Sequence, residues 1–233
     1  MISEIPKDDL IDTILELWTA SFHGLLSTHS VKFPGYPFGS LLPVCRDVKG
    51  NPLLLISHLA QHTRNLEANP HCSLTFSETG DGDIQQVGRL TCLARAEAID
   101  SKASAERYFR YYPESRRYFK EMNFRFYRLT LQQHYFIGGF GSARWFDASR
   151  VPPPIPYSAV DEAELLFQLN AQDHNLLQRY LLHRKLPTNG AVIEAVGIDP
   201  LGMDIRLGQK LQRLPFTQHS PIANELLNQI KAL

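Results

Sequence analysis

The sequence has no excess of charge of either sign, because 24 Lys and Arg stand against 24 Asp and Glu in 233 residues. This balance removes the sequence-independent attraction to phosphate backbones that general nucleic-acid binding needs. No apolar run approaches the roughly 20 residues that span a bilayer, and the first residues lack the basic and apolar regions of a signal peptide. We therefore expect a cytoplasmic protein with neither a nucleic-acid nor a membrane partner.

Cysteine is scarce, and the common catalytic motifs are missing. Cys45, Cys72 and Cys92 are far apart and each lies in an apolar run. This spacing argues against a disulfide framework or a zinc site and predicts three buried, inert thiols. The sequence has no HExxH, GxSxG or phosphate-loop motif either.

One proline-rich segment, residues 151–156, divides the chain. Consecutive prolines form neither a helix interior nor a central strand, and they favour a stiff extended spacer. The sequence therefore predicts a first domain at residues 1–150, a linker at 151–156 and a second domain at 157–233.

The first domain reads as an α+β fold rich in strands. Apolar residues at three- and four-residue steps between Leu10 and Phe22 predict an opening amphipathic helix. Asn69-Pro70 ends a short helix predicted at residues 60–68. The predicted strand segments are 22–28, 39–47, 53–57, 71–77, 88–99, 123–131 and 135–140. About six strands joined by short turns favour a closed or partly closed barrel.

The second domain reads as a small α/β unit. Ser158, with Asp161 three residues on, is a capping signal for a helix that runs to about Arg184. Strands are expected at 191–198 and 203–207, with a third at 211–216. Ser220-Pro221 then starts a terminal helix.

Arginines alternate with aromatic residues between 107 and 119, a pattern that also suits stacking on single-stranded nucleic acid. The arginines are Arg107, Arg110, Arg116 and Arg117. Because the chain is neutral, we interpret the segment as an aromatic core face flanked by solvated arginines.

A polar cluster follows the third predicted strand. Its members are Ser40, Ser57, His58, His62, Thr63, Arg64 and Asn65. Hydroxyls, an imidazole and a guanidinium at the start of a short helix could hold an anion, because free helix N–H groups point there as well. The same groups could instead cap the helix and face water.

Two sequence stretches carry a family resemblance. They are Tyr-Pro-Phe-Gly-Ser-Leu at residues 36–41 and Ser-His-Leu-Ala-Gln-His-Thr-Arg-Asn at residues 57–65. With Gly-Gly-Phe-Gly-Ser-Ala at 138–143, they resemble the FMN-binding split-barrel (pyridoxamine 5'-phosphate oxidase-like) superfamily, most closely its haem-utilisation, HugZ-type branch. The tail, with Asp-His at 173–174, resembles the small domain often fused to these barrels. The resemblance implies a six-stranded antiparallel split barrel with flanking helices, plus a small C-terminal α/β domain. It also implies a homodimer with cofactor pockets at the subunit interface.

Two cofactors remain open, FMN and haem. In pyridoxamine-phosphate oxidases a strand arginine, a strand-end hydroxyl and a Ser-Arg-Lys segment hold the flavin phosphate. Here Ser57 matches the hydroxyl, but Gly39-Ser40 and Ala60-Gln61-His62 replace the charged positions, which removes strong charge-assisted bonds. For haem, a neutral histidine would ligate the iron. The candidates are His58, His62, His134, His174 and His219.

The resulting hypothesis is a homodimeric small-molecule-binding protein of the haem-utilisation type, an oxidoreductase acting on haem or using flavin. The alternative is a non-catalytic haem carrier or a regulatory, partner-docking protein. The expected cofactor-binding residues are Ser40, Ser57, His62, Thr63, Arg64 and Asn65.

Overall fold

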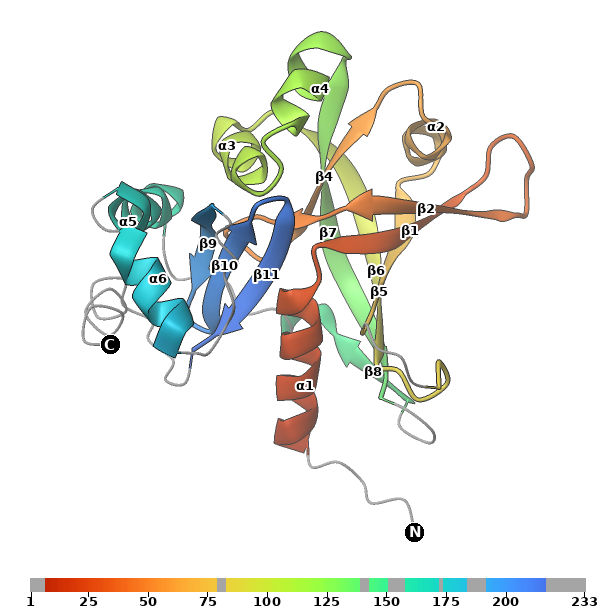
Figure 1. Ribbon diagram of the computed structural model, residues 1–233. Coiled ribbons are helices and arrows are strands. Elements are labelled where there is room, and N and C mark those ends of the chain that lie inside the picture. The colour runs from red at the N-terminus through yellow and green to blue at the C-terminus, as the bar shows by residue number, and fades with distance from the viewer. Residues whose placement is uncertain are drawn as a thin grey trace. The chain divides into compact units, whose positions relative to one another are not determined.

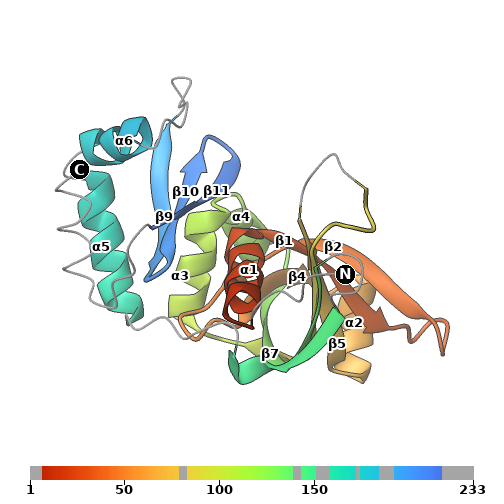
Figure 2. The same cartoon turned by 90° about the horizontal axis from the view of Figure 1, so that it is seen from below.

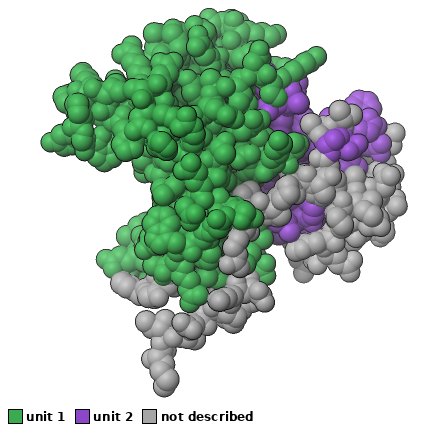
Figure 3. Space-filling view, turned by 180° about the vertical axis from the view of Figure 1, so that it is seen from behind, with its two compact units in different colours: residues 1–102, 114–153 green, residues 103–113, 154–233 purple. Residues whose placement is uncertain are grey.

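The computed structural model describes residues 7–78, 83–138, 143–150, 158–171, 174–183 and 192–216. The chain divides into two compact units, which Figure 3 colours separately. Unit 1 comprises residues 1–102 and 114–153, and unit 2 comprises residues 103–113 and 154–233. Segment 103–113 thus groups with unit 2, although it was predicted to lie in the first domain. The expected linker, residues 151–156, lies outside the described residues, and the boundaries there stay a prediction.

Unit 1 is built on one curled antiparallel sheet, as Figure 1 shows. Its strands are β1 (His23–His29), β2 (Pro37–Pro43), β3 (Cys45–Arg46), β4 (Pro52–Ser57), β5 (His71–Ser77), β6 (Arg89–Ile99), β7 (Phe124–Ile137) and β8 (Ala143–Asp147). They follow the order β2-β1-β5-β6-β7-β4-β3, and β8 also pairs with β7. With its flanking helices this half-barrel confirms the expected α+β class and is consistent with a split barrel.

Helix α1 (Lys7–Ala20) fills the inside of the curl, where Figure 2 shows it nearly end-on. Its apolar stripe is buried: Ile14 and Trp18 are fully covered, and the Trp18 ring meets the Phe76 ring edge-on at 5.2 Å. Burying each large apolar side chain stabilises the fold by about 1.5–3 kcal/mol. The predicted opening helix is therefore confirmed, and it forms part of the barrel core.

The remaining helices lie in the connections. They are α2 (Gln61–Ala68), α3 (Lys102–Tyr111), α4 (Ser115–Glu121), a 3-10 turn η1 (Ala148–Arg150), α5 (Ala159–Ala171) and α6 (His174–His183). Among the helices described, none combines the length and the apolar character needed to cross a bilayer.

The strand count differs from the six expected, since eight strands are described in the large sheet. The 39–47 segment is two strands, β2 and β3, and β8 was not anticipated. In the opposite sense, β7 is one strand where two were predicted. A bulge keeps it continuous: Leu93 pairs with Gln133 and Ala94 with Leu131, which leaves Gln132 as the extra residue.

Unit 2 contains a second antiparallel sheet, in the order β11-β10-β9. Its strands are β9 (Ile193–Asp199), β10 (Gly202–Leu207) and β11 (Lys210–Pro215). The Ser158 cap is confirmed, because its Oγ accepts from the Asp161 N–H at 3.1 Å while Asp161 accepts from the Ser158 N–H at 3.2 Å. The structure has α5 and α6 where one helix was predicted. The predicted terminal helix after Ser220-Pro221 lies outside the described residues.

Buried charges hold α3 in unit 2. Glu162 is fully buried and pairs with Arg107 and Arg110. The interpretation of Arg107 as a solvated arginine is therefore wrong, since it is only 4% exposed. Exposed positions are confirmed for Arg116 and Arg117. Removing one partner of such a buried pair costs about 3–5 kcal/mol, which explains why this segment groups with unit 2.

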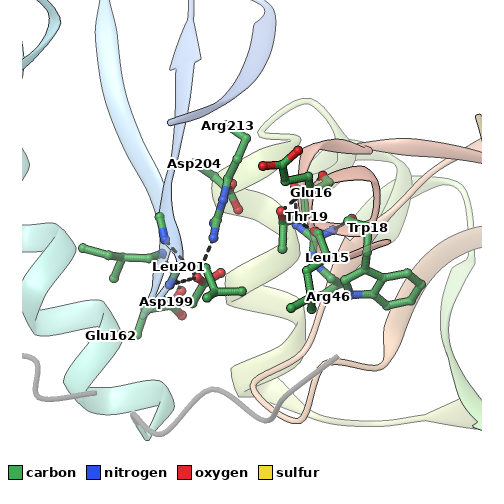
Figure 4. A network of polar contacts seen from close by, with 12 residues as sticks. Leu15, Glu16, Trp18, Thr19, Arg46, Glu162, Asp199, Leu201, Asp204 and Arg213 are labelled. Atoms are coloured by element: carbon green, nitrogen blue, oxygen red, sulfur yellow. Dashed lines mark hydrogen bonds and ion pairs between the residues drawn. The ribbon is translucent and has the colours of Figure 1, made fainter. Parts of the chain in front are cut away.

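A second buried group in unit 2 centres on Arg213, which Figure 4 shows pointing toward Asp199. Its guanidinium lies 2.5 Å from Asp199 and 3.0 Å from Asp204. Burial alone would lower the pKa of Arg213, but the two carboxylates raise it above its ordinary value. The charge therefore stays on Arg213 despite its burial.

Candidate functional site

The turn between β4 and α2 brings most of the expected site residues together. Strand β4 ends at Ser57, and the Ala60 N–H donates to the Ser57 carbonyl at 3.1 Å. Helix α2 then begins at Gln61 and ends before Asn69-Pro70, as predicted. The Thr63 hydroxyl donates to the same Ser57 carbonyl at 2.6 Å. The carbonyl of the last β4 residue therefore fixes the direction of α2.

Two of the expected residues, Thr63 and Asn65, are fully buried. The Asn65 amide donates to Thr28 Oγ1 at 2.9 Å, and its oxygen accepts from the Val31 N–H at 3.1 Å and from Gln61 at 2.9 Å. These bonds join α2 to β1 and to the loop that follows it. The structure thus gives Thr63 and Asn65 a role in positioning α2, and cofactor contact by them stays a prediction.

His62 and Ser40 meet although 22 residues separate them. His62 lies in the first turn of α2 and Ser40 on β2, and His62 Nδ1 is 3.1 Å from Ser40 Oγ. The other ring nitrogen, Nε2, is buried and has no hydrogen-bond partner in the described part of the chain. Burial lowers the pKa of His62, because it disfavours the charged imidazolium. The pair therefore holds a neutral imidazole whose Nε2 is buried and has no hydrogen bond in the described residues.

The start of α2 is positively polarised. Its N-cap residue, Ala60, makes no side-chain cap, and its first turn holds no acidic residue. The first N–H groups of a helix have no partner inside the helix and carry the positive end of its dipole. Arg64, one turn on, is exposed, and no ion pair or hydrogen bond of its side chain is found among the described residues. Together these groups can receive one carboxylate or a similar anion.

Ser57 and His58 complete the turn. Ser57 Oγ accepts from the Leu59 N–H at 3.2 Å, and His58 Nδ1 lies 3.1 Å from the Asn123 carbonyl oxygen. Leu59 itself is 66% exposed. A polar donor set and an exposed apolar side chain therefore lie next to each other, a combination that sequence analysis did not anticipate because it grouped only polar residues.

The other candidate histidines are less informative. His134 is fully buried on β7, with its ring 6.0 Å from that of Trp18. The side chain of His174 and the whole of His219 lie outside the described parts. Within the described residues no group of three or more histidine, cysteine or acidic side chains could hold a metal ion.

The donor set can be compared with what each cofactor needs. A flavin phosphate is a dianion that two or three fixed cations usually bind. At the start of α2 the chain offers Arg64 and a neutral His62, while Gln61 is engaged with Asn65. A haem offers separate propionates, an apolar face and an iron that takes a neutral imidazole. The residues present fit haem better than FMN.

The curled sheet with its flanking helices defines a protein of the split-barrel kind. The β-barrel model of the CREG family matches residues 16–150, which is more than half of the chain. The chain belongs to the CREG β-barrel family.

Similar proteins agree with this assignment. The chain is 37% identical over 95 residues to the chloroplastic heme oxygenase HOZ of Arabidopsis thaliana, which covers 41% of this chain and 29% of that protein. It is 29% identical over 126 residues to the heme oxygenase HutZ of Vibrio cholerae, covering 51% of this chain and 71% of that one. The chain thus matches less than a third of the length of the plant relative.

A solved structure extends the fold likeness to both units. The protein Atu2129 of Agrobacterium tumefaciens, of unknown function, gives a TM-score of 0.76 at 21% identity, covering 99% of this chain and 98% of that one. At this identity the likeness concerns the fold alone.

Proposed function

We propose that the chain is a homodimeric split-barrel protein that binds haem at the subunit interface and acts as an oxidoreductase of the haem-utilisation type. The observation that carries this proposal is the site around α2, where donors for a carboxylate adjoin the exposed apolar side chain of Leu59. Haem is an amphipathic ligand of that kind. The two relatives named as heme oxygenases support the same choice.

In this proposal the six expected residues divide into two groups. Ser40, Ser57, His62 and Arg64 contact the polar edge of the cofactor, whereas Thr63 and Asn65 hold α2 in position. The haem, when bound, supplies the redox chemistry of its iron. The chain's own residues bind the propionates, orient the ring and limit access of water.

A second copy of the chain would cover the outer face of the sheet. Residues facing each other across six strands form one row on this face: Leu41, Leu25, Thr75, Thr91, Tyr135 and Trp145. Leu41 is 70% exposed and Trp145 59% exposed, and the Trp145 ring lies 4.8 Å from that of Tyr135. Apolar and aromatic side chains concentrated on one face are typical of a subunit interface.

The test is a visible absorption titration with haemin and, separately, with FMN. We expect a saturable Soret band, with affinity about tenfold or more weaker in the double variant His62→Ala, Arg64→Ala. The control is His71→Ala, Arg95→Ala, an exposed pair of the same types facing each other across β5 and β6. Sedimentation equilibrium of the haem complex should give the mass of two chains.

Three results would contradict the proposal. Equal haem affinity in the His62/Arg64 variant and its control would remove the assigned residues. Bound flavin without a saturable haem band would make the protein a flavin oxidoreductase. Stable haem in the presence of NAD(P)H and oxygen would favour a carrier over an enzyme.

A further inference from the structure

The imidazole of His58 is fixed in one tautomer. Its Nδ1 lies 3.1 Å from the backbone carbonyl oxygen of Asn123. A carbonyl oxygen only accepts hydrogen bonds, so Nδ1 must carry the proton and donate. Nε2 of the neutral ring then carries the lone pair. This is the arrangement found in metal-ligating histidines, whose second nitrogen donates to a carbonyl or carboxylate.

The carbonyl that orients His58 is itself firmly placed. Asn123 connects α4 to β7 and adopts a left-handed backbone conformation, with φ of 52°. Asparagine tolerates that region better than most residues. On one side the Met122 N–H donates to the Tyr118 carbonyl at 3.1 Å, and on the other Phe124 pairs with Ser57. Both chain segments that meet at this hydrogen bond are therefore held by backbone pairing.

Apolar side chains flank the His58–Asn123 hydrogen bond. Leu59, next to His58, is 66% exposed, and Met122, next to Asn123, is 51% exposed. Tyr118 is 43% exposed, and its ring lies 5.5 Å from that of Phe124, the residue after Asn123. A half-buried histidine with a lone pair on Nε2, and with exposed apolar and aromatic residues next to it and to Asn123 in the chain, suits a flat apolar ligand that carries a metal.

The other described histidines lack this combination. Within the described residues, no hydrogen bond orients the ring of His23 or His29 at the two ends of β1. Nε2 of His62 is shut off from solvent, and its Nδ1 faces a hydroxyl that can donate or accept. His134 is fully buried. His71 is oriented by the Asn69 amide oxygen at 3.1 Å, but it is exposed on β5, where its cross-strand partner is the exposed Arg95. Orientation, access and an apolar border therefore coincide at His58.

We propose that His58 ligates the haem iron through Nε2, with the Asn123 carbonyl as the hydrogen-bond acceptor that orients the ring. The inference rests on the proposed haem-binding function and adds the residue that holds the metal. In this arrangement the turn between β4 and α2 binds both the iron and the carboxylates of the haem. His58 takes the iron, while the start of α2 takes the carboxylates.

The experiment is optical and electron paramagnetic resonance spectroscopy of the haem complexes of the wild type, His58→Ala and the control His71→Ala. We expect a histidine-ligated spectrum in the wild type and the control. In His58→Ala that spectrum is lost, haem binds about tenfold or more weakly, and added imidazole restores the signal. Asn123→Gly keeps the carbonyl and suits a positive φ, so it should retain the wild-type spectrum.

The outcomes separate this inference from the proposed function. A wild type that binds haem and a His58→Ala variant with an unchanged spectrum would overturn the inference and leave the function standing. A wild type with no saturable haem binding would overturn both. If circular dichroism shows that His58→Ala is unfolded, His58→Gln replaces it, since glutamine keeps a polar group of similar reach, and the same loss of the histidine signal is required.

Discussion

Substituting Gly197 by alanine would test whether Tyr111 fastens α3 to the second sheet. A Cβ on Gly197 would overlap the Tyr111 hydroxyl and lie 2.7 Å from Cζ of the same ring. Tyr111 cannot easily move, because it is 2% exposed and its hydroxyl donates to the Asp204 carboxylate at 2.6 Å. Overpacking costs about 1–3 kcal/mol, and a lost hydrogen bond to a charged group about 1.5–3 kcal/mol. Gly197→Ala should therefore lower the free energy of unfolding by about 2.5–6 kcal/mol.

The assay is urea unfolding followed by circular dichroism, arranged as a double-mutant cycle with Tyr111→Phe. Tyr111→Phe alone should cost about 1.5–3 kcal/mol, since it removes the hydrogen bond to Asp204 together with the longer one that the hydroxyl accepts from Arg107 at 3.4 Å. The double variant should cost less than the sum, because without the hydroxyl the worst overlap is gone and the bond cannot be lost twice. Tyr118→Phe, in which an exposed hydroxyl is removed, serves as the control and should change stability by less than about 0.5 kcal/mol. A Gly197→Ala cost below about 0.5 kcal/mol, or strict additivity, would refute the reasoning.

Two further predictions concern buried titratable groups. Burial raises the pKa of Cys72 to about 12 and also raises the pKa of Cys92, and Cys45 is buried as well. A disulfide reagent at pH 8 should therefore label no thiol in the native protein and three thiols in urea. Rapid labelling of the native protein would contradict the burial. Desolvation lowers the pKa of His62 below its ordinary 6.5. The unfolded chain therefore binds a proton at His62 more readily than the folded chain does. The stability that neutral His62 contributes is present above pH 6.5 and is lost as the pH falls below it. An NMR titration of His62 should have its midpoint below 6.5, and a midpoint at or above 6.5 would show that the ring is not desolvated.

Local patterns were sufficient to predict much of unit 1. Alternation at residues 71–77 places Cys72, Leu74 and Phe76 in the core, and Asn69-Pro70 ends α2 where the backbone restriction of proline requires it. Local sequence patterns failed where pairing with a distant segment determines the secondary structure. The polar Gln132-Gln133 pair reads as a turn, but pairing with β6 turns it into a bulge within one strand.

The largest error has the same origin. Arg107 and Arg110 look like solvated charges on an aromatic helix, because the carboxylate that pairs with both, Glu162, lies more than 50 residues further along the chain. No local signal connects these residues. Glu162 follows the Ser158 cap by one turn, in a helix whose first turn is expected to carry acidic residues for its dipole alone. Glu162 is therefore explained locally by the helix dipole, and the sequence does not show that it also pairs with two distant arginines.

At the candidate site, the stretches that carry the family resemblance contain residues with two different roles. Thr63 and Asn65 belong to the stretch at residues 57–65, and both are buried and hydrogen-bonded within unit 1. Their bonds to Ser57 on β4 and to Thr28 on β1 hold α2 against these two strands. The groups that the proposal assigns to the ligand, His58, His62, Arg64 and Ser40, lie in the same stretches. One exposed guanidinium, an uncapped helix start and the imidazole of His58, oriented by the Asn123 carbonyl, supply little fixed positive charge but one good ligand for a metal. By this argument the framework of a flavin-type barrel is retained here, while the side chains placed on it favour an iron porphyrin over a phosphate dianion.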